Sequence, residues 1–148
     1  QKENEMLEEM IARATAVWTD MKELTEMADR ILTTRKSDLM NLCQRSFDGL
    51  AGSHGFAVTR GVGGLETAFR AVWKNGEGGP TWGFCANTMP AGMGHGCGHQ
   101  MQGPAILGAA LAVQQAAGDR PFTLTVYGTP GEENISGKYI MIRNGCHF

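Results

Sequence analysis

The chain has 148 residues, a formal net charge of −2 and a hydrophobic content of 42%. This length suits one domain with its own core and is too short for two ordinary domains. Because acidic and basic residues are mixed, with no basic cluster, the composition argues against a nucleic-acid-binding protein. The most apolar stretch, residues 104–117, is shorter than the roughly 20 residues of a membrane-spanning helix, which argues against a membrane protein. The acidic N-terminus also lacks the pattern of a secretory signal.

The four cysteines are far apart and irregularly spaced: Cys43, Cys85, Cys97 and Cys146. Small secreted domains stabilised by disulfides show a denser pattern. We therefore expect a reducing compartment, either the cytoplasm or an organelle matrix. Cys43 falls within an apolar helical pattern, which predicts a small core residue.

The first third of the sequence predicts helices. Apolar residues recur at steps of three and four over residues 1–32, which is the pattern of a long amphipathic helix. They are Leu7, Met10, Ala14, Val17, Met21, Leu24, Ala28 and Ile31. We expect this helix to lie on its own domain; a coiled coil, or docking onto another chain, is the alternative. Ser37 and Asp38 are suited to cap a second helix from Leu39 to Phe47.

After Gly49 the sequence alternates between short strands and helices. β-Branched and aromatic residues predict four strands, separated by glycine-rich turns at Gly61–Gly64 and Asn75–Gly79. An Ala-rich helix is expected between the third and fourth strands, with small residues at Gly103, Gly108, Ala109 and Ala112 for close packing on a sheet. A last helix is expected to begin at Asn134 or Ser136 and to end at Arg143. The expected strands are Phe56–Arg60, Thr67–Trp73, Thr81–Cys85 and Thr123–Tyr127, and the Ala-rich helix is Gly103–Ala117.

Between the third strand and the Ala-rich helix lies the densest group of metal-ligand side chains, the run GHGCGH over residues 94–99. His95, Cys97 and His99 alternate with glycines there, and imidazole and thiolate are the ligands that zinc and neighbouring transition metals prefer. The run therefore indicates a metal site. The alternative is a glycine-rich turn whose His and Cys side chains pack or face water.

A second polar loop follows the fourth strand and carries Glu132 and Glu133. In open α/β sheets the carboxyl ends of parallel strands form the ligand crevice, so we expect this loop and the GHGCGH loop to converge there. One histidine, one thiolate and one carboxylate would then share an ion, and a second carboxylate would activate a bound water. The sequence thus predicts an α/β fold, a mixed sheet flanked by helices.

Two strings, GHGCGHQMQG and YGTPGEENISGK, resemble the signature loops of the metallopeptidase family that includes aminoacylases, auxin-conjugate amidohydrolases and aminobenzoyl-glutamate hydrolase. Cys97 and Glu133 stand 36 positions apart, a separation typical of that family. The stretch HGFAVTRGVGGLETAFRAVW resembles the strand pair that precedes the loops, so the resemblance covers about Asp29 to Phe148.

The resemblance implies the N-terminal half of a zinc-peptidase-like catalytic domain, in which two divalent ions, zinc or manganese, support attack of a metal-bound water on an amide bond. It implies Cys97, His99 and Glu133 as metal ligands and Glu132 as the general base, with His95 in a supporting position. The substrate would be an N-acyl amino acid, aminobenzoyl-glutamate or a dipeptide. The implied organisation is an N-terminal amphipathic helix over residues 1–36 and a partial amidohydrolase-like domain over residues 37–148, without the lid and dimerisation domain.

Several positions depart from the family pattern. The segment from Cys85 to Pro90 reads CANTMP where the family carries an acidic pattern such as Glu-x-Asp-Ala-Leu-Pro, and Gln100 replaces Asp or Asn. The His-x-x-Pro-Glu segment before Gly55 and the downstream histidine ligands are missing. We therefore expect a truncated or degenerate member, and keep as the alternative a non-catalytic subunit of a larger assembly, formed as a homo- or hetero-oligomer through helix 1–32.

Overall fold

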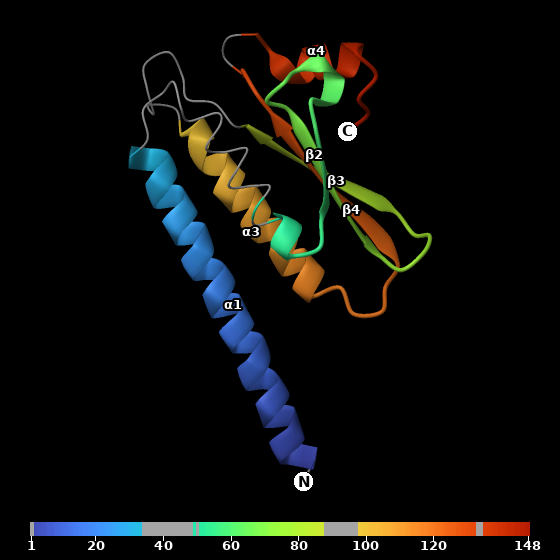
Figure 1. Ribbon diagram of the computed structural model, residues 1–148. Coiled ribbons are helices and arrows are strands. Elements are labelled where there is room, and N and C mark those ends of the chain that lie inside the picture. The colour runs from blue at the N-terminus through green and yellow to red at the C-terminus, as the bar shows by residue number, and fades with distance from the viewer. Residues whose placement is uncertain (1, 34–48, 50, 88–97, 133–134) are drawn as a thin grey trace.

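The structure is a computed structural model that describes residues 2–33, 49, 51–87, 98–132 and 135–148. It is a mixed α/β fold in which helices flank one four-stranded sheet (Figure 1). The strands are β1 (Ala57–Arg60), β2 (Phe69–Asn75), β3 (Thr81–Asn87) and β4 (Phe122–Thr129). The helices are α1 (Lys2–Thr33), α3 (Gln102–Gln115) and α4 (Gly137–Arg143), with 3₁₀ turns η1 (Val62–Gly64) and η2 (His99–Met101). The helix expected from Leu39 to Phe47, with Cys43, lies outside the described residues.

The strand order is β1-β2-β4-β3. The pairs β1–β2 and β2–β4 are antiparallel, whereas β3 and β4 are parallel because α3 crosses between them. The mixed sheet flanked by helices predicted from the sequence is therefore confirmed. No helix within the described ranges is both long and apolar enough to cross a membrane.

Alternate residues of β4 face two different hydrophobic clusters, as the two-residue repeat of a strand requires. Leu124 and Val126 lie in the main core with Leu107 and Leu111 of α3. On the opposite face, Tyr127 packs with Met141 of α4 in a smaller cluster. The central strand is consequently buried on both faces along nearly its whole length.

Helix α3 does not use its smallest residues against the sheet in the way expected. Ala109 and Ala112 are exposed, and the residues that enter the core are Leu107, Ala110 and Leu111. Gly108 serves a different contact, because a Cβ atom there would lie 3.1 Å from Cδ1 of Leu24 on α1. Gly108 therefore allows α1 to approach α3 closely, while Gly103 and Ala110 are among the buried residues of α3.

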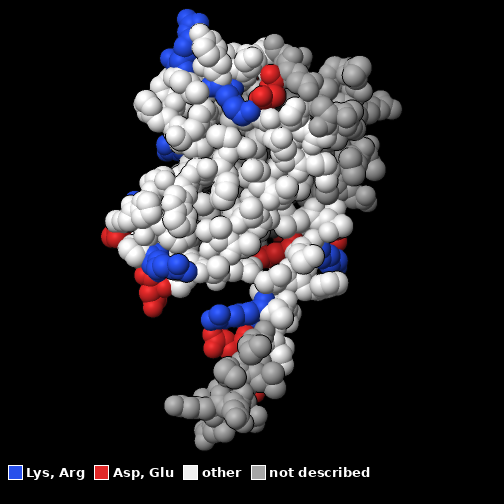
Figure 2. All heavy atoms as spheres, turned by 180° about the vertical axis from the view of Figure 1, so that it is seen from behind, with Lys and Arg blue, Asp and Glu red and all other residues white. Residues whose placement is uncertain are grey.

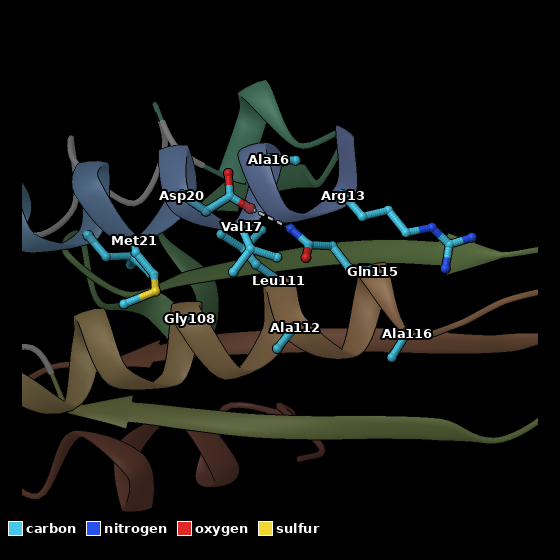
Figure 3. Close-up of a pocket in the computed structure, with 11 residues that line it drawn as sticks. Arg13, Ala16, Val17, Asp20, Met21, Gly108, Leu111, Ala112, Gln115 and Ala116 are labelled. Carbon is cyan, nitrogen blue, oxygen red and sulfur yellow. Dashed lines mark hydrogen bonds between the residues drawn. The ribbon is translucent and has the colours of Figure 1, made fainter. Parts of the chain in front are cut away.

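Between α1 and α3 lies a groove of about 750 Å³, lined mainly by apolar side chains (Figure 3). Val17, Met21 and Leu24 contribute from α1, opposite Leu111 and Ala112. Seen from behind, much of the molecular surface is uncharged and the charged side chains are scattered (Figure 2). This view agrees with the absence of a basic cluster in the sequence.

The bounds of all four strands differ from the expectation by one or two residues, most clearly in β2 and β4. β2 begins at Phe69 and not at Thr67, because Ala68 still belongs to the preceding turn: its N–H donates to Leu65 O at 2.9 Å, and its carbonyl accepts from Gly61 N–H at 2.8 Å. β4 continues through Gly128 and Thr129, two residues beyond the expected end at Tyr127.

Position 128 requires glycine because of packing within the sheet, and not because the chain turns there. It pairs with Phe69 of β2, and a Cβ atom at position 128 would lie 2.0 Å from the Phe69 ring. Only glycine leaves room for this ring in the core. The chain leaves the strand after Thr129, at Pro130 and Gly131.

Candidate active site at the carboxyl edge of the sheet

The last residues of the two parallel strands define the site. Asn87 ends β3 and Thr129 ends β4, and the two are paired in the sheet register. Because the strands run in the same direction, the loops that follow them leave from the same edge. The loops that follow β3 and β4 therefore start side by side at the carboxyl edge of the sheet, while residues 88–97 and 133–134, which carry most of the two loops, lie outside the described residues.

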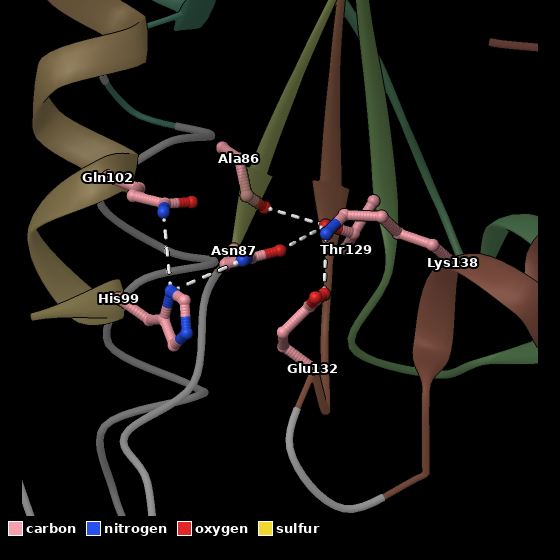
Figure 4. A network of polar contacts seen from close by, with 7 residues as sticks. All are labelled: Ala86, Asn87, His99, Gln102, Thr129, Glu132 and Lys138. Atoms are coloured by element: carbon pink, nitrogen blue, oxygen red, sulfur yellow. Dashed lines mark hydrogen bonds and ion pairs between the residues drawn. The ribbon is translucent and has the colours of Figure 1, made fainter. Parts of the chain in front are cut away.

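His99 stands at the entry of α3, directly above this edge (Figure 4). It opens η2 after Gly98, whose φ of 76° is in the left-handed region that favours glycine. Its Nδ1 atom lies 3.4 Å from Nδ2 of Asn87 and 3.2 Å from Nε2 of Gln102. Two amide side chains thus fix the orientation of the half-buried imidazole ring.

Asn87 connects His99 to the neighbouring strand. Oγ1 of Thr129 lies 3.0 Å from Oδ1 of Asn87 and 3.1 Å from the carbonyl oxygen of Ala86. Asn87 is 4% exposed and Thr129 is 1% exposed, so the protein supplies these hydrogen bonds and bulk water does not. The network therefore ties the candidate ligand His99 to the ends of both parallel strands (Figure 4).

Glu132 lies beyond the end of β4 and is half-buried. Nζ of Lys138 donates to its Oε2 at 2.5 Å, and Lys138 stands in the first turn of α4. Gly137 sets this turn close to the strand end, since a Cβ atom at that position would lie 1.7 Å from the carbonyl oxygen of Pro130. The candidate general base is thus paired with a cation held by α4.

The start of α4 agrees with the expectation in position but not in its capping. Ser136 precedes the helix, as predicted, yet it has a left-handed φ of 52° and its side chain makes no capping hydrogen bond. Asn134 lies outside the described residues. The helix ends at Arg143 before Gly145, as expected.

Cys85 lies on β3 near this edge, half-buried in the smaller hydrophobic cluster with Tyr127. Burial raises the pKa of the Cys85 thiol above its ordinary value of 9.0, and the positive charge of Lys138 opposes this shift. Lys138 therefore acts electrostatically on Cys85 and binds Glu132. A thiol with a raised pKa is a poor nucleophile at neutral pH.

Of the four predicted site residues, the structure describes His99 and Glu132; Cys97 and Glu133 lie outside the described residues, as does His95. Within the described ranges, no group of three His, Cys, Asp or Glu side chains is arranged to hold a metal ion. The described part of the donor set nevertheless fits such an ion. A histidine whose one ring nitrogen is hydrogen-bonded to neighbouring side chains is the usual form of a metal-ligating histidine.

The sequence interpretation misses Asn87, Gln102, Thr129 and Lys138. Asn87 enters it only as a departure from an acidic pattern, although a polar residue at the carboxyl end of a buried strand is itself a signal. Thr129 reads as a turn residue. Lys138 carries a weaker signal, as a cation in the first turn of the helix that follows the Glu132 loop.

Comparison with known proteins gives two relatives, and no protein-family model matches the chain. The chain is 33% identical to one subunit of the p-aminobenzoyl-glutamate hydrolase of Escherichia coli (strain K12) over an alignment 153 residues long, which covers 88% of this chain and 31% of that protein. It is 37% identical to the Xaa-Arg dipeptidase of Mus musculus over 94 residues, covering 56% of this chain and 22% of that protein.

The chain thus spans about a third or less of the length of the curated relatives that it matches. Both relatives are named for hydrolysis of an amide or peptide bond, and the first is named as a subunit. They support the family indicated by the GHGCGHQMQG and YGTPGEENISGK loops. This chain is therefore a relative of the amidohydrolase and metallopeptidase family that includes aminobenzoyl-glutamate hydrolase.

Proposed function

We propose that the chain forms part of a divalent-metal-dependent amide hydrolase site. In this proposal Cys97, His99 and Glu133 bind zinc or manganese, and Glu132 is the general base. The observation that carries it is the position of His99 and Glu132 beyond the paired strand ends at Asn87 and Thr129. Parallel strands deliver both side chains to one edge, where ligands bind in open α/β sheets.

The roles follow from the chemistry of each group. A bound divalent ion would act as a Lewis acid and bring the pKa of a water molecule towards neutrality. Glu132 would take the proton of that water and pass it to the leaving nitrogen. Lys138 would orient the Glu132 carboxylate through the hydrogen bond between them.

The substrate class is drawn from the family and the names of the relatives. We propose aminobenzoyl-glutamate, a dipeptide or an N-acyl amino acid. All three present an amide bond next to a carboxylate-bearing residue, so one site could accept them by the same chemistry. The activity of a whole relative is proposed here only for an assembly that contains this chain.

Elemental analysis and one substitution test the proposal. The purified chain should contain near-stoichiometric zinc or manganese, and Glu132→Gln should abolish amide cleavage while leaving the metal bound. Glu66→Gln is the matched control, because Glu66 is an exposed carboxylate in a turn just ahead of β2. Absence of bound metal, or a Glu132→Gln variant as active as the control, would contradict the proposal.

A second candidate is a non-catalytic subunit of a larger assembly. Asn87 stands where the family carries an acidic residue, and helix α1 exposes large apolar side chains, with Trp18 71% and Ile11 57% exposed. Isolated exposed apolar residues are common, but these two are one heptad apart on a single face of α1. That spacing suits contact with another chain.

The assembly candidate predicts that surface substitutions on α1 reduce the size of the assembly, whereas the hydrolase candidate makes no such prediction. Deleting residues 1–28 would also remove Leu24, which packs on the core, so point substitutions are sharper. For the assembly candidate, Ile11→Glu with Trp18→Glu should lower the molecular mass measured by light scattering, whereas Ala12→Glu on another exposed face should not. A mass unaffected by the double substitution would count against docking through α1.

A further inference from the structure

We propose that Asn87 and Thr129 hold the neutral ring of His99 in the tautomer that carries its proton on Nδ1, so that Nε2 carries the lone pair. The inference depends on the proposed function only for the role of His99 as a metal ligand. The tautomer itself is a property of the chain without metal.

Thr129 has a single hydroxyl proton but two neighbouring oxygen atoms. Its Oγ1 atom lies within hydrogen-bond distance of the carbonyl oxygen of Ala86, at 3.1 Å, and of the side-chain amide of Asn87, at 3.0 Å, where the amide is placed with Oδ1 towards the hydroxyl. A hydroxyl group has one proton to donate, and a carbonyl oxygen can only accept. Both contacts are therefore hydrogen bonds only if Thr129 donates to Ala86 and accepts from Asn87.

This requirement fixes the direction of the Asn87 amide. A half-turn about the last side-chain bond exchanges the NH₂ group and the oxygen with almost no change in shape. To donate to Thr129, Asn87 must direct Nδ2 towards the hydroxyl and Oδ1 towards His99. An amide oxygen only accepts, so the imidazole must supply the proton from Nδ1, across the 3.4 Å contact.

Because Asn87 and Thr129 are buried, leaving either of these hydrogen bonds unmade would be costly. With Asn87 4% and Thr129 1% exposed, bulk water cannot replace a hydrogen bond that is left unmade. Gln102, which lies 3.2 Å from the same ring nitrogen, can turn its own amide to present Oε1 to the Nδ1 proton. The amides of Asn87 and Gln102 can each adopt either of two orientations, and the hydroxyl group of Thr129 selects one of them.

The consequence concerns metal binding. A neutral imidazole binds a metal through the nitrogen that has no proton, and the other nitrogen commonly donates to a fixed acceptor that sets the ring orientation. Asn87 would be this acceptor for His99, and Thr129 would keep it in the accepting orientation. Asn87 and Thr129 are then positioning residues that act through His99.

Nitrogen NMR of the whole chain tests the tautomer directly. The histidine-labelled chain is freed of metal and studied at a pH where added base no longer changes the His99 signals. The expected spectrum shows a protonated Nδ1 and an unprotonated Nε2. A spectrum dominated by a proton on Nε2 would overturn the inference.

Two substitutions of Thr129 test the cause. Thr129→Val removes the hydroxyl and should give a mixture of both tautomers, whereas Thr129→Ser should keep the Nδ1 proton. Thr125→Val is the matched control, because Thr125 is also buried on β4, and it should leave the His99 spectrum unchanged. A pure Nδ1–H signal in a folded Thr129→Val variant would overturn the role of the hydroxyl.

Zinc affinity, measured by competition with a chelating dye, gives a separate readout. Asn87→Ala should weaken zinc binding about 10- to 100-fold. Asn87→Asp keeps an acceptor for the ring proton and should lose less. If the wild-type chain binds no zinc but His99 shows the Nδ1–H form, the proposed function fails and this inference stands. If zinc binds and the apo ring carries its proton on Nε2, the inference fails alone.

Discussion

The carboxylate of Asp20 on α1 lies 3.3 Å from Nε2 of His54, which precedes β1 (Oδ1 to Nε2). The other oxygen of Asp20 accepts a hydrogen bond of 2.6 Å from Nε2 of Gln115 on α3 (Figure 3). Gln114, the residue before Gln115 in α3, donates through its side chain to the carbonyl oxygen of His54 at 2.8 Å. One carboxylate thus connects α1 to α3 and to the segment ahead of the sheet, at the wall of the apolar groove.

We predict that Asp20→Ala lowers the free energy of unfolding by about 1–3 kcal/mol, because it leaves Gln115 and His54 without their shared partner. Asp20→Asn should cost less, since an amide oxygen still accepts from Gln115. Urea denaturation measures both. Glu23→Ala on the exposed face of α1 should change stability by no more than about 0.5 kcal/mol. Equal losses for Asp20→Ala and Glu23→Ala would show that the contact contributes nothing.

The contact between Gly137 and Pro130 gives a second prediction. Gly137→Ala places a Cβ atom 1.7 Å from the Pro130 carbonyl oxygen, so the first turn of α4 has to move. We expect a loss of about 1–3 kcal/mol in the free energy of unfolding, as for other overpacking substitutions.

The matched control for Gly137 is Gly52→Ala. Gly52 is helical and no atom outside its own neighbourhood lies within 4 Å of an added Cβ, so alanine should be neutral or stabilising by up to about 1 kcal/mol. Thermal unfolding of both variants compares them. A Gly137→Ala variant as stable as Gly52→Ala would mean that α4 does not need this close approach.

Cys85 supplies a prediction on pH dependence. Because burial raises the pKa of the Cys85 thiol, the thiolate population that reacts with alkylating agents rises at a higher pH in the folded chain than in the unfolded chain. The shift in pKa contributes stability to the folded state below about pH 9. This contribution is lost as the pH rises through the pKa of the folded thiol. Peptide-resolved mass spectrometry of alkylation rates, with and without denaturant, checks this directly.

Lys138→Met should slow the alkylation of Cys85 further, because it removes the positive charge that lowers the thiol pKa. Lys138→Arg keeps the charge and is the control. Faster alkylation in the methionine variant would contradict the electrostatic influence of Lys138 on Cys85.

Strand positions, and the common edge from which the two loops leave the sheet, could be predicted because both depend on local pattern and on the geometry of parallel strands. The bounds were less predictable. Gly128 reads as a turn residue in the sequence, yet it is a strand residue made necessary by the ring of Phe69, a contact between distant segments. The same limit hid Asp20, a charged residue whose partners His54 and Gln115 are brought to it only by the tertiary fold.

The pair formed by Lys138 and Glu132 makes a last prediction, which depends on the proposed function. Loss of the general base itself, in Glu132→Gln, should remove the roughly 100- to 10,000-fold contribution of acid–base catalysis. Lys138→Met removes only the cation that orients the carboxylate, so we expect a smaller fall in kcat, of about tenfold, with little change in KM. Lys138→Arg should retain most of the rate. Steady-state hydrolysis of aminobenzoyl-glutamate by the metal-loaded assembly that contains each variant chain measures all three variants. A Lys138→Met variant with the wild-type kcat would mean that the ion pair is not used in the reaction, and that Glu132 leaves Lys138 before it meets the substrate.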